Sequence, residues 1–134
     1  MNARRKILVI DDDPEICQAM ETILGDNGYE VFTATDTVRG EAILEERKPD
    51  LLILDIMMAT IQEGLDFAAK IRKKEGPYGL PIVIVSGRPA TEKGYQRSVD
   101  EDMDWIAADI FMEKPVDPDD LLRNVQSLLA ARKA

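Results

Sequence analysis

Three consecutive aspartates, Asp11, Asp12 and Asp13, follow the short apolar run KILVI near the start of the chain. A fourth, Asp55, follows a second apolar run in LLILDIMM. Close carboxylates repel one another, by up to about 4 kcal/mol per pair at 4 Å and an effective dielectric constant of 20, so a cluster of them needs a cation. Mg²⁺ suits such a cluster because it takes carboxylate, water and phosphate oxygens as ligands. The aspartates therefore indicate a Mg²⁺ site at which a phosphoryl group is handled.

Two further polar side chains follow apolar runs later in the chain, Ser86 in PIVIVSG and Lys114 in FMEKP. In an open parallel α/β sheet, ligands bind outside the carboxyl ends of the strands. The carboxylates would then meet a hydroxyl and an ammonium in one crevice. Taken singly, Ser86 and Lys114 are as well explained as surface residues. Together with Asp55 they indicate a site.

Five short apolar runs rich in Val, Ile, Leu and Phe have the length and composition of β-strands. They lie at Lys6–Ile10, Glu30–Ala34, Leu51–Leu54, Ile82–Val85 and Ile110–Met112. Amphipathic stretches separate them, and the central runs are apolar on both faces. This order predicts a doubly wound α/β fold, in which five helices cover both faces of a five-stranded parallel sheet.

The expected helices run from Pro14 to the Asn27-Gly28 stop, from about Thr37 to Arg47, from roughly Gly64 to Lys74, and from Pro118 onward. Asp13 is better explained as a helix N-cap than as a metal ligand, because Pro14 follows it at the first helical position. Asp117 before Pro118 predicts the same start for the last helix. A further helix is expected within residues 87–109. We favour a start at the capping-box residue Ser98 over one at Thr91, because Gly and Pro interrupt residues 87–97.

Composition narrows the class of protein. The chain has 134 residues, 45% hydrophobic and 32% charged, which fits one globular domain over residues 1–134. A formal net charge of −9 disfavours direct binding to nucleic acid phosphates. The first apolar stretch is too short for a signal peptide or a membrane span, which favours a cytoplasmic protein. The single cysteine, Cys17, lies in a helical pattern, where a small packing residue is expected.

The stretches ILVIDDDPE, PDLLILDIMM, LPIVIVSG and FMEKP resemble, in order, those of the receiver domains of two-component response regulators. The outline is most similar to the single-domain, chemotaxis-type members, and the resemblance covers essentially the whole chain. It implies the flavodoxin-like strand order 2-1-3-4-5. It also implies that Asp55 is the phospho-acceptor, a nucleophilic carboxylate that takes a phosphoryl group from the phosphohistidine of a sensor kinase.

The same resemblance assigns the surrounding residues. Asp12 would hold Mg²⁺ directly and Asp11 largely through water, with Asp55 and the backbone carbonyl of Met57 completing the metal site. Ser86 would hydrogen-bond to one phosphoryl oxygen and Lys114 would pair with another. The peptide bond between Lys114 and the proline that follows it would be cis.

Phe111 matches the aromatic switch position of the family, and Ser86 would act with it. Met57 and Arg88 match two positions that tune the lifetime of the phosphoryl group. Because Met57 is apolar and cannot orient a water molecule, we expect slow self-dephosphorylation. The chain departs from the pattern at Ala59, where proline is usual, in the ATIQEG stretch, which is one residue longer, and between Ser86 and Lys114, where it is also longer.

The leading hypothesis is a stand-alone phosphorylation switch that catalyses only its own phosphorylation and dephosphorylation. Its partners would be a sensor histidine kinase or a histidine phosphotransfer protein and a downstream protein target, with homodimerisation as one consequence of phosphorylation. A second hypothesis is a haloacid-dehalogenase-type phosphatase with Asp11 as nucleophile. The helix start at Asp13-Pro14 and the unexplained Asp55 speak against it. A third is a pseudo-receiver, which binds partners without being phosphorylated.

Overall fold

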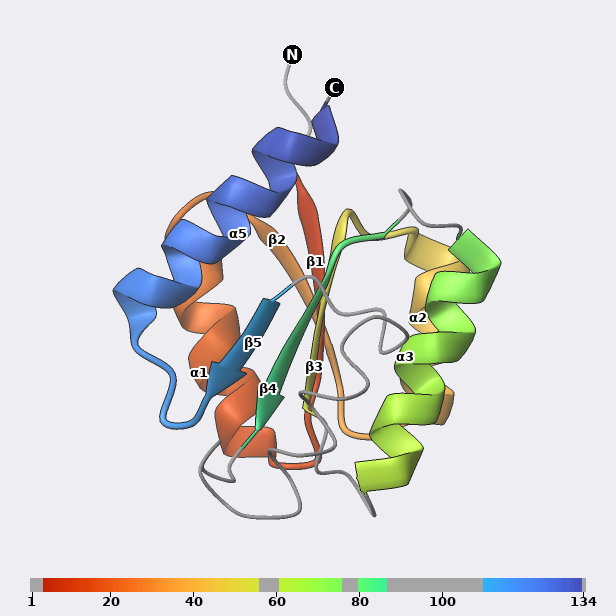
Figure 1. Ribbon diagram of the computed structural model, residues 1–134. Helices are drawn as coiled ribbons and strands as arrows, with labels where there is room; N and C mark the ends of the chain where they lie inside the picture. The colour runs from red at the N-terminus through yellow and green to blue at the C-terminus, as the bar shows by residue number, and fades with distance from the viewer. Residues whose placement is uncertain (1–3, 56–60, 76–79, 87–109, 134) are drawn as a thin grey trace.

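The computed structural model describes residues 4–55, 61–75, 80–86 and 110–133. The strands are β1 (Lys6–Ile10), β2 (Glu30–Ala34), β3 (Leu51–Asp55), β4 (Ile82–Ser86) and β5 (Ile110–Glu113). The helices are α1 (Pro14–Gly25), α2 (Thr37–Arg47), α3 (Ile61–Glu75) and α5 (Pro118–Lys133). All strand pairs are parallel, in the order β2-β1-β3-β4-β5 (Figure 1). The predicted doubly wound α/β fold and its strand order are confirmed.

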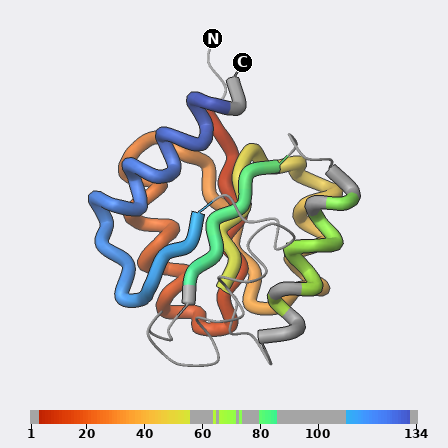
Figure 2. The backbone as a smooth tube through the Cα atoms, in the orientation of Figure 1, coloured from red at the N-terminus to blue at the C-terminus, as the bar shows by residue number. Residues whose placement is uncertain are grey.

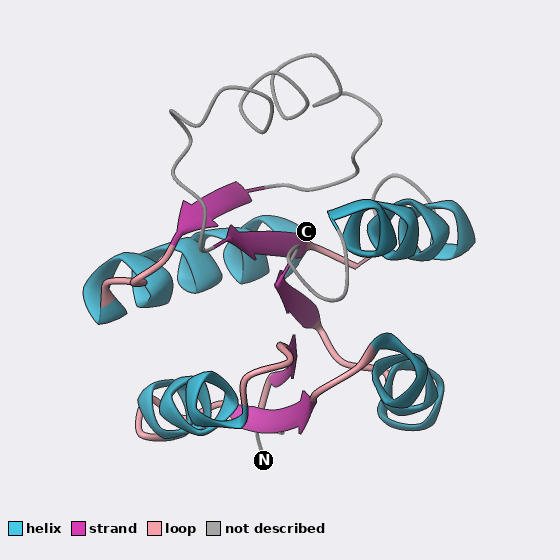
Figure 3. Ribbon diagram, turned by 90° about the horizontal axis from the view of Figure 1, so that it is seen from below, coloured by secondary structure: helices cyan, strands magenta, loops and turns pink. Residues whose placement is uncertain are grey.

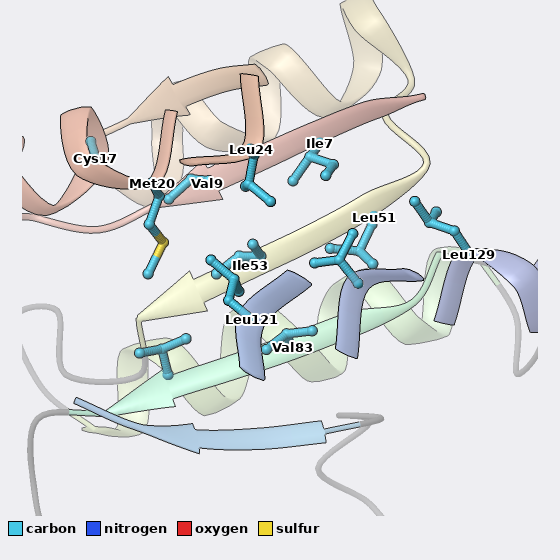
Figure 4. Close-up of a cluster of buried hydrophobic side chains, with 12 residues drawn as sticks. Ile7, Val9, Cys17, Met20, Leu24, Leu51, Ile53, Val83, Leu121 and Leu129 are labelled. Atoms are coloured by element: carbon cyan, nitrogen blue, oxygen red, sulfur yellow. The ribbon is translucent and has the colours of Figure 1, made fainter. Parts of the chain in front are cut away.

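Alternate residues of the central strands face opposite layers, as the pleat of a strand requires. On β1, Ile7 and Val9 join a core cluster with side chains of α1 and α5, and Leu8 and Ile10 join a second cluster with side chains of α2 and α3. The same alternation continues on β3 and β4. Figure 3 shows the two helix pairs on opposite faces of the sheet, and Figure 4 shows part of the cluster beneath α1 and α5.

The helix starts follow from the cap residues that the sequence predicts. The Asp13 side chain accepts a hydrogen bond from the Glu15 amide at 2.9 Å, and Pro14 occupies the first turn of α1. At the start of α5, the Asp117 carboxylate accepts a hydrogen bond of 3.0 Å from the backbone amide three residues later. Gly28, with φ of +94°, takes the left-handed conformation just after α1 ends. Among the described helices, none is long and apolar enough to cross a membrane.

The bounds of β1, β2 and α2 agree with the sequence analysis, and three strands are longer by one residue. Asp55 and Ser86 are therefore the last residues of β3 and β4, where we expected them just after the strands. The predicted start of α3 at Gly64 was wrong, since the helix begins at Ile61 and Gly64 is buried inside it. Helix propensity is a weak constraint that tertiary packing outweighs. The helix expected within 87–109 lies outside the described residues.

The order of the strands reverses between β1 and β3, which are neighbours at the centre of the sheet. Ile10 of β1 pairs with Leu54 of β3, so the residues that follow, Asp11 and Asp55, come side by side. The strands end together at one end of the molecule, at the bottom of Figure 2. This is the place where open α/β sheets bind ligands.

Candidate functional site

Three carboxylates gather where β1 and β3 end. Oxygens of Asp11, Asp12 and Asp55 all lie within 4.8 Å of one another. Asp11 is 1% exposed and Asp55 is 3% exposed, whereas Asp12 is exposed to solvent. Two of the three charges are thus held away from water. At 4.8 Å and an effective dielectric constant of 20, two such charges repel each other by about 3.5 kcal/mol.

Lys114, the residue after β5, reaches across the sheet end to these carboxylates. Its Nζ lies 2.7 Å from Oδ2 of Asp11 and 3.5 Å from Oδ2 of Asp55. Burial alone would lower the pKa of the Lys114 ammonium, but the hydrogen bond to Asp11 and the charge of Asp55 outweigh it, so the pKa is raised. The Lys114–Pro115 peptide is cis, as the resemblance implies.

Both carboxylate oxygens of Asp11 already have partners. Oδ2 accepts from Lys114, and Oδ1 accepts from the backbone amide of Asp13 at 2.9 Å. Asp12, by contrast, is exposed to solvent. The carboxylate of Asp12 is therefore more accessible to a metal ion than that of Asp11.

The charges in the cluster fit a divalent cation. Three ionised carboxylates and the Lys114 ammonium leave a formal charge of −2. The donors are all carboxylate oxygens, which are hard ligands and suit Mg²⁺ rather than a soft transition metal. The residues present thus fit the metal ion that the sequence indicates.

The remaining predicted site residues fall in different places. Ser86 ends β4, the neighbour of β3, and pairs in register with Glu113 of β5. Phe111 lies on β5, partly buried, and packs against the core cluster beneath α2 and α3. Met57 and Arg88 lie outside the described residues, as does Ala59.

Two contacts of Asp11 did not follow from the sequence analysis. The first is the amide of Asp13, which donates to the Asp11 side chain two residues before it. Aspartate side chains commonly accept from the amide two residues on, so this bond could have been predicted. The second is the thiol of Cys17, whose Sγ lies 3.3 Å from the backbone oxygen of Asp11. Cys17 is buried in a core cluster, which confirms the predicted packing role. Burial, followed by the charge of Asp11, raises the pKa of the thiol.

Comparison with known proteins agrees with this geometry. A model of the response regulator receiver domain matches residues 7–126. The crystal structure of a CheY-like response regulator receiver domain protein from Methanospirillum hungatei has a TM-score of 0.81 at 27% identity, and the match covers 98% of this chain and 98% of that one. The likeness thus includes both the fold and the sequence.

Two curated relatives come from Synechocystis sp. The DNA-binding dual master transcriptional regulator RpaA is 31% identical over 124 residues, covering 92% of this chain and 48% of RpaA. Response regulator Rre1 is 32% identical over 132 residues, covering 96% of this chain and 53% of Rre1. The chain spans about half the length of the curated relatives it matches. Given the match over residues 7–126, the chain belongs to the response regulator receiver domain family of two-component signal transduction.

Proposed function

We propose that the chain is a phosphorylation switch in which Asp55 accepts a phosphoryl group from a phosphohistidine of a sensor kinase or phosphotransfer protein. One observation carries the proposal. Asp55 is buried at the end of β3, within 4.8 Å of two further carboxylates and with the Lys114 ammonium 3.5 Å from its Oδ2. Members of this family generally use Mg²⁺ at an acidic pocket, and this cluster has the donors for it.

We assign the metal site to Asp12, Asp55 and the backbone carbonyl of Met57, with Asp11 acting largely through water. The engagement of both Asp11 oxygens by Asp13 and Lys114 supports an indirect role for Asp11. When bound, Mg²⁺ would neutralise the charge that gathers on the phosphoryl oxygens during transfer. The side chains of the site hold the acceptor and the incoming group in line.

In the transfer step, an oxygen of the Asp55 carboxylate attacks phosphorus, so that an O–P bond forms and the N–P bond of the donor breaks. The electron pair of that bond leaves with the imidazole of the donor histidine. Lys114 would move from its ion pairs with the carboxylates toward one phosphoryl oxygen. The Ser86 hydroxyl would donate a hydrogen bond to a second phosphoryl oxygen. Catalysis is then confined to the protein's own phosphorylation and dephosphorylation.

The switch would pass from the site to the surface through Ser86 and Phe111. Phe111 is partly buried against a core cluster and comes three residues before Lys114, so a rearrangement at the site can change its packing. Phosphorylation would shift the population between two packings of this aromatic ring and change which partner binds. Met57 and Arg88 would set the lifetime of the phosphoryl group, and the apolar Met57 favours a long one.

The wider expectations stay predictions. They are a receiver domain over residues 1–134, a cytoplasmic location, no direct nucleic acid binding by this domain and homodimerisation on phosphorylation. The phosphatase hypothesis loses support, because the Asp11 carboxylate is 1% exposed and both of its oxygens are already engaged.

The proposal is tested by the intact mass of the protein after incubation with Mg²⁺ and acetyl phosphate. We expect one phosphoryl adduct, absent from Asp55→Asn and absent when EDTA replaces Mg²⁺. Wild-type protein that binds Mg²⁺ but takes up no phosphoryl group, from acetyl phosphate or from a kinase, would favour the pseudo-receiver. Turnover of phosphomonoesters that is abolished by Asp11→Asn would favour the phosphatase.

A further inference from the structure

Cys17 of α1 contacts the backbone where β1 runs into the acidic turn. Its Sγ lies 3.3 Å from the backbone oxygen of Asp11 and 3.7 Å from that of Ala34, the last residue of β2. The amide of Asp11 donates to the same Ala34 oxygen at 3.0 Å. The thiol therefore joins the ends of two neighbouring strands at the point where the chain continues to Asp12.

This contact is shielded from water. Cys17 is 4% exposed and Asp11 is 1% exposed. A thiol is a weak donor, but a buried carbonyl that loses its partner cannot replace it with solvent. The hydrogen bond therefore restrains the Asp11 carbonyl even though the bond itself is weak.

Restraining that carbonyl also restrains the next residue. The peptide unit between Asp11 and Asp12 is planar, so the direction of the Asp11 oxygen sets the direction of the Asp12 amide and Cα. The Asp12 side chain is exposed, so the backbone determines its position more than packing does. A small rotation of this peptide would move the Asp12 carboxylate relative to Asp55.

We propose that Cys17 is a positioning residue for the metal site. Its thiol holds the peptide between Asp11 and Asp12 so that the Asp12 carboxylate lies beside those of Asp11 and Asp55. The inference rests on the Mg²⁺ site proposed above. The thiol remains a hydrogen-bond donor throughout, and no bond to sulfur forms or breaks.

The test compares variants that remove the donor with one that keeps it. Cys17→Ala and Cys17→Val both lack a donor, and the valine fills the space that alanine leaves. Cys17→Ser keeps a hydroxyl that can donate to the Asp11 carbonyl. The dissociation constant for Mg²⁺ is measured by isothermal titration calorimetry on the full chain, under conditions where circular dichroism shows each variant to be folded.

We expect the two donor-free variants to bind Mg²⁺ about three- to tenfold more weakly than wild type. Loss of a hydrogen bond that supports a metal ligand typically costs about 10- to 100-fold in metal affinity, and a thiol is a weaker donor than most. Cys17→Ser should stay within about twofold of wild type, in line with a retained donor. Met20→Leu is the matched control. Met20 lies on the same face of α1 and in the same core cluster, as Figure 4 shows, and should change stability without changing Mg²⁺ affinity.

Three results would overturn the inference, and they are distinguishable. If wild type binds Mg²⁺ and Asp12→Asn does not, but all Cys17 variants bind like wild type, the metal site stands and Cys17 is only a packing residue. If Cys17→Ser loses as much Mg²⁺ affinity as Cys17→Ala, the hydrogen-bond donor has no effect and Cys17 is again only a packing residue. If wild type itself shows no Mg²⁺ binding, the proposed metal site fails together with the inference.

Discussion

Replacing Asp12 by asparagine should stabilise the metal-free protein. The carboxylate oxygens of Asp12, Asp11 and Asp55 lie within 4.8 Å of one another. At that distance and an effective dielectric constant of 20, two unit charges repel by about 3.5 kcal/mol. Water and salt screen most of this repulsion because Asp12 is exposed. We therefore expect the free energy of unfolding in EDTA to rise by about 1 to 2 kcal/mol after this discount.

The assay is urea unfolding followed by circular dichroism, with EDTA or with MgCl₂. In wild type, Mg²⁺ at ten times its dissociation constant should add about 1.4 kcal/mol, because it binds only the folded chain. Asp12→Asn should lose this response. Asp26→Asn, which changes an aspartate at the end of α1, is the control: its stability should shift by less than about 0.5 kcal/mol and its Mg²⁺ response should match wild type.

The reasoning would be refuted by either of two results. One is an Asp12→Asn variant that is less stable than wild type in EDTA, since the residual charge of the cluster would then not be repulsive. The other is an equal Mg²⁺ response in wild type and variant, which would place the ion away from Asp12.

Three further changes test other parts of the structure, each by urea unfolding. Lys114→Met should lower the free energy of unfolding by about 2 to 4 kcal/mol near neutral pH, because two buried carboxylates lose their cation. The pKa of Lys114 is raised above its usual 10.5. The difference in free energy of unfolding between wild type and this variant should therefore have its full size below pH 10.5 and disappear as the pH rises through the raised pKa. Gly40→Ala should destabilise the protein by about 1 to 3 kcal/mol, because a Cβ there would lie 2.9 Å from Cγ1 of buried Ile10. Gly25→Ala is its control, because a Cβ at Gly25 meets open space and should not destabilise the protein. Asp117→Ala should cost about 1 kcal/mol, because α5 loses its N-cap hydrogen bond.

The sequence predicted most of the fold because local and global signals agree along most of the chain. Short apolar runs define β1 and β2 to the residue, and an amphipathic stretch that begins after Asp36 and ends before Lys48 does the same for α2. The start of α3 differs from the prediction because glycine favours helix ends, whereas Gly64 is buried inside the helix and tertiary packing outweighs its low helix propensity. The extra residues at the ends of β3 and β4 come from pairing with neighbouring strands, which a single run of sequence does not contain.

The site could be predicted as a set of residues but not as a geometry. Residues at strand ends converge by topology, so the meeting of Asp11, Asp55 and Lys114 followed from the strand pattern. That Lys114 lies closer to Asp11 than to Asp55 depends on how a long side chain crosses the end of the sheet. The contact of Cys17 with a backbone oxygen depends on the orientation of α1, which spacing alone does not specify.

The residual charge of the cluster explains why the site is not built for maximum stability. A second internal lysine could neutralise one of the remaining two charges, and the metal-free protein would then be more stable. That lysine would occupy the oxygens that an ion and a phosphoryl group must reach, so added stability would be gained at the expense of function. With one ammonium shared by Asp11 and Asp55, the cluster is most stable only when a divalent cation binds. The repulsion that Asp12 contributes is therefore the same property that makes the fold responsive to its ligand.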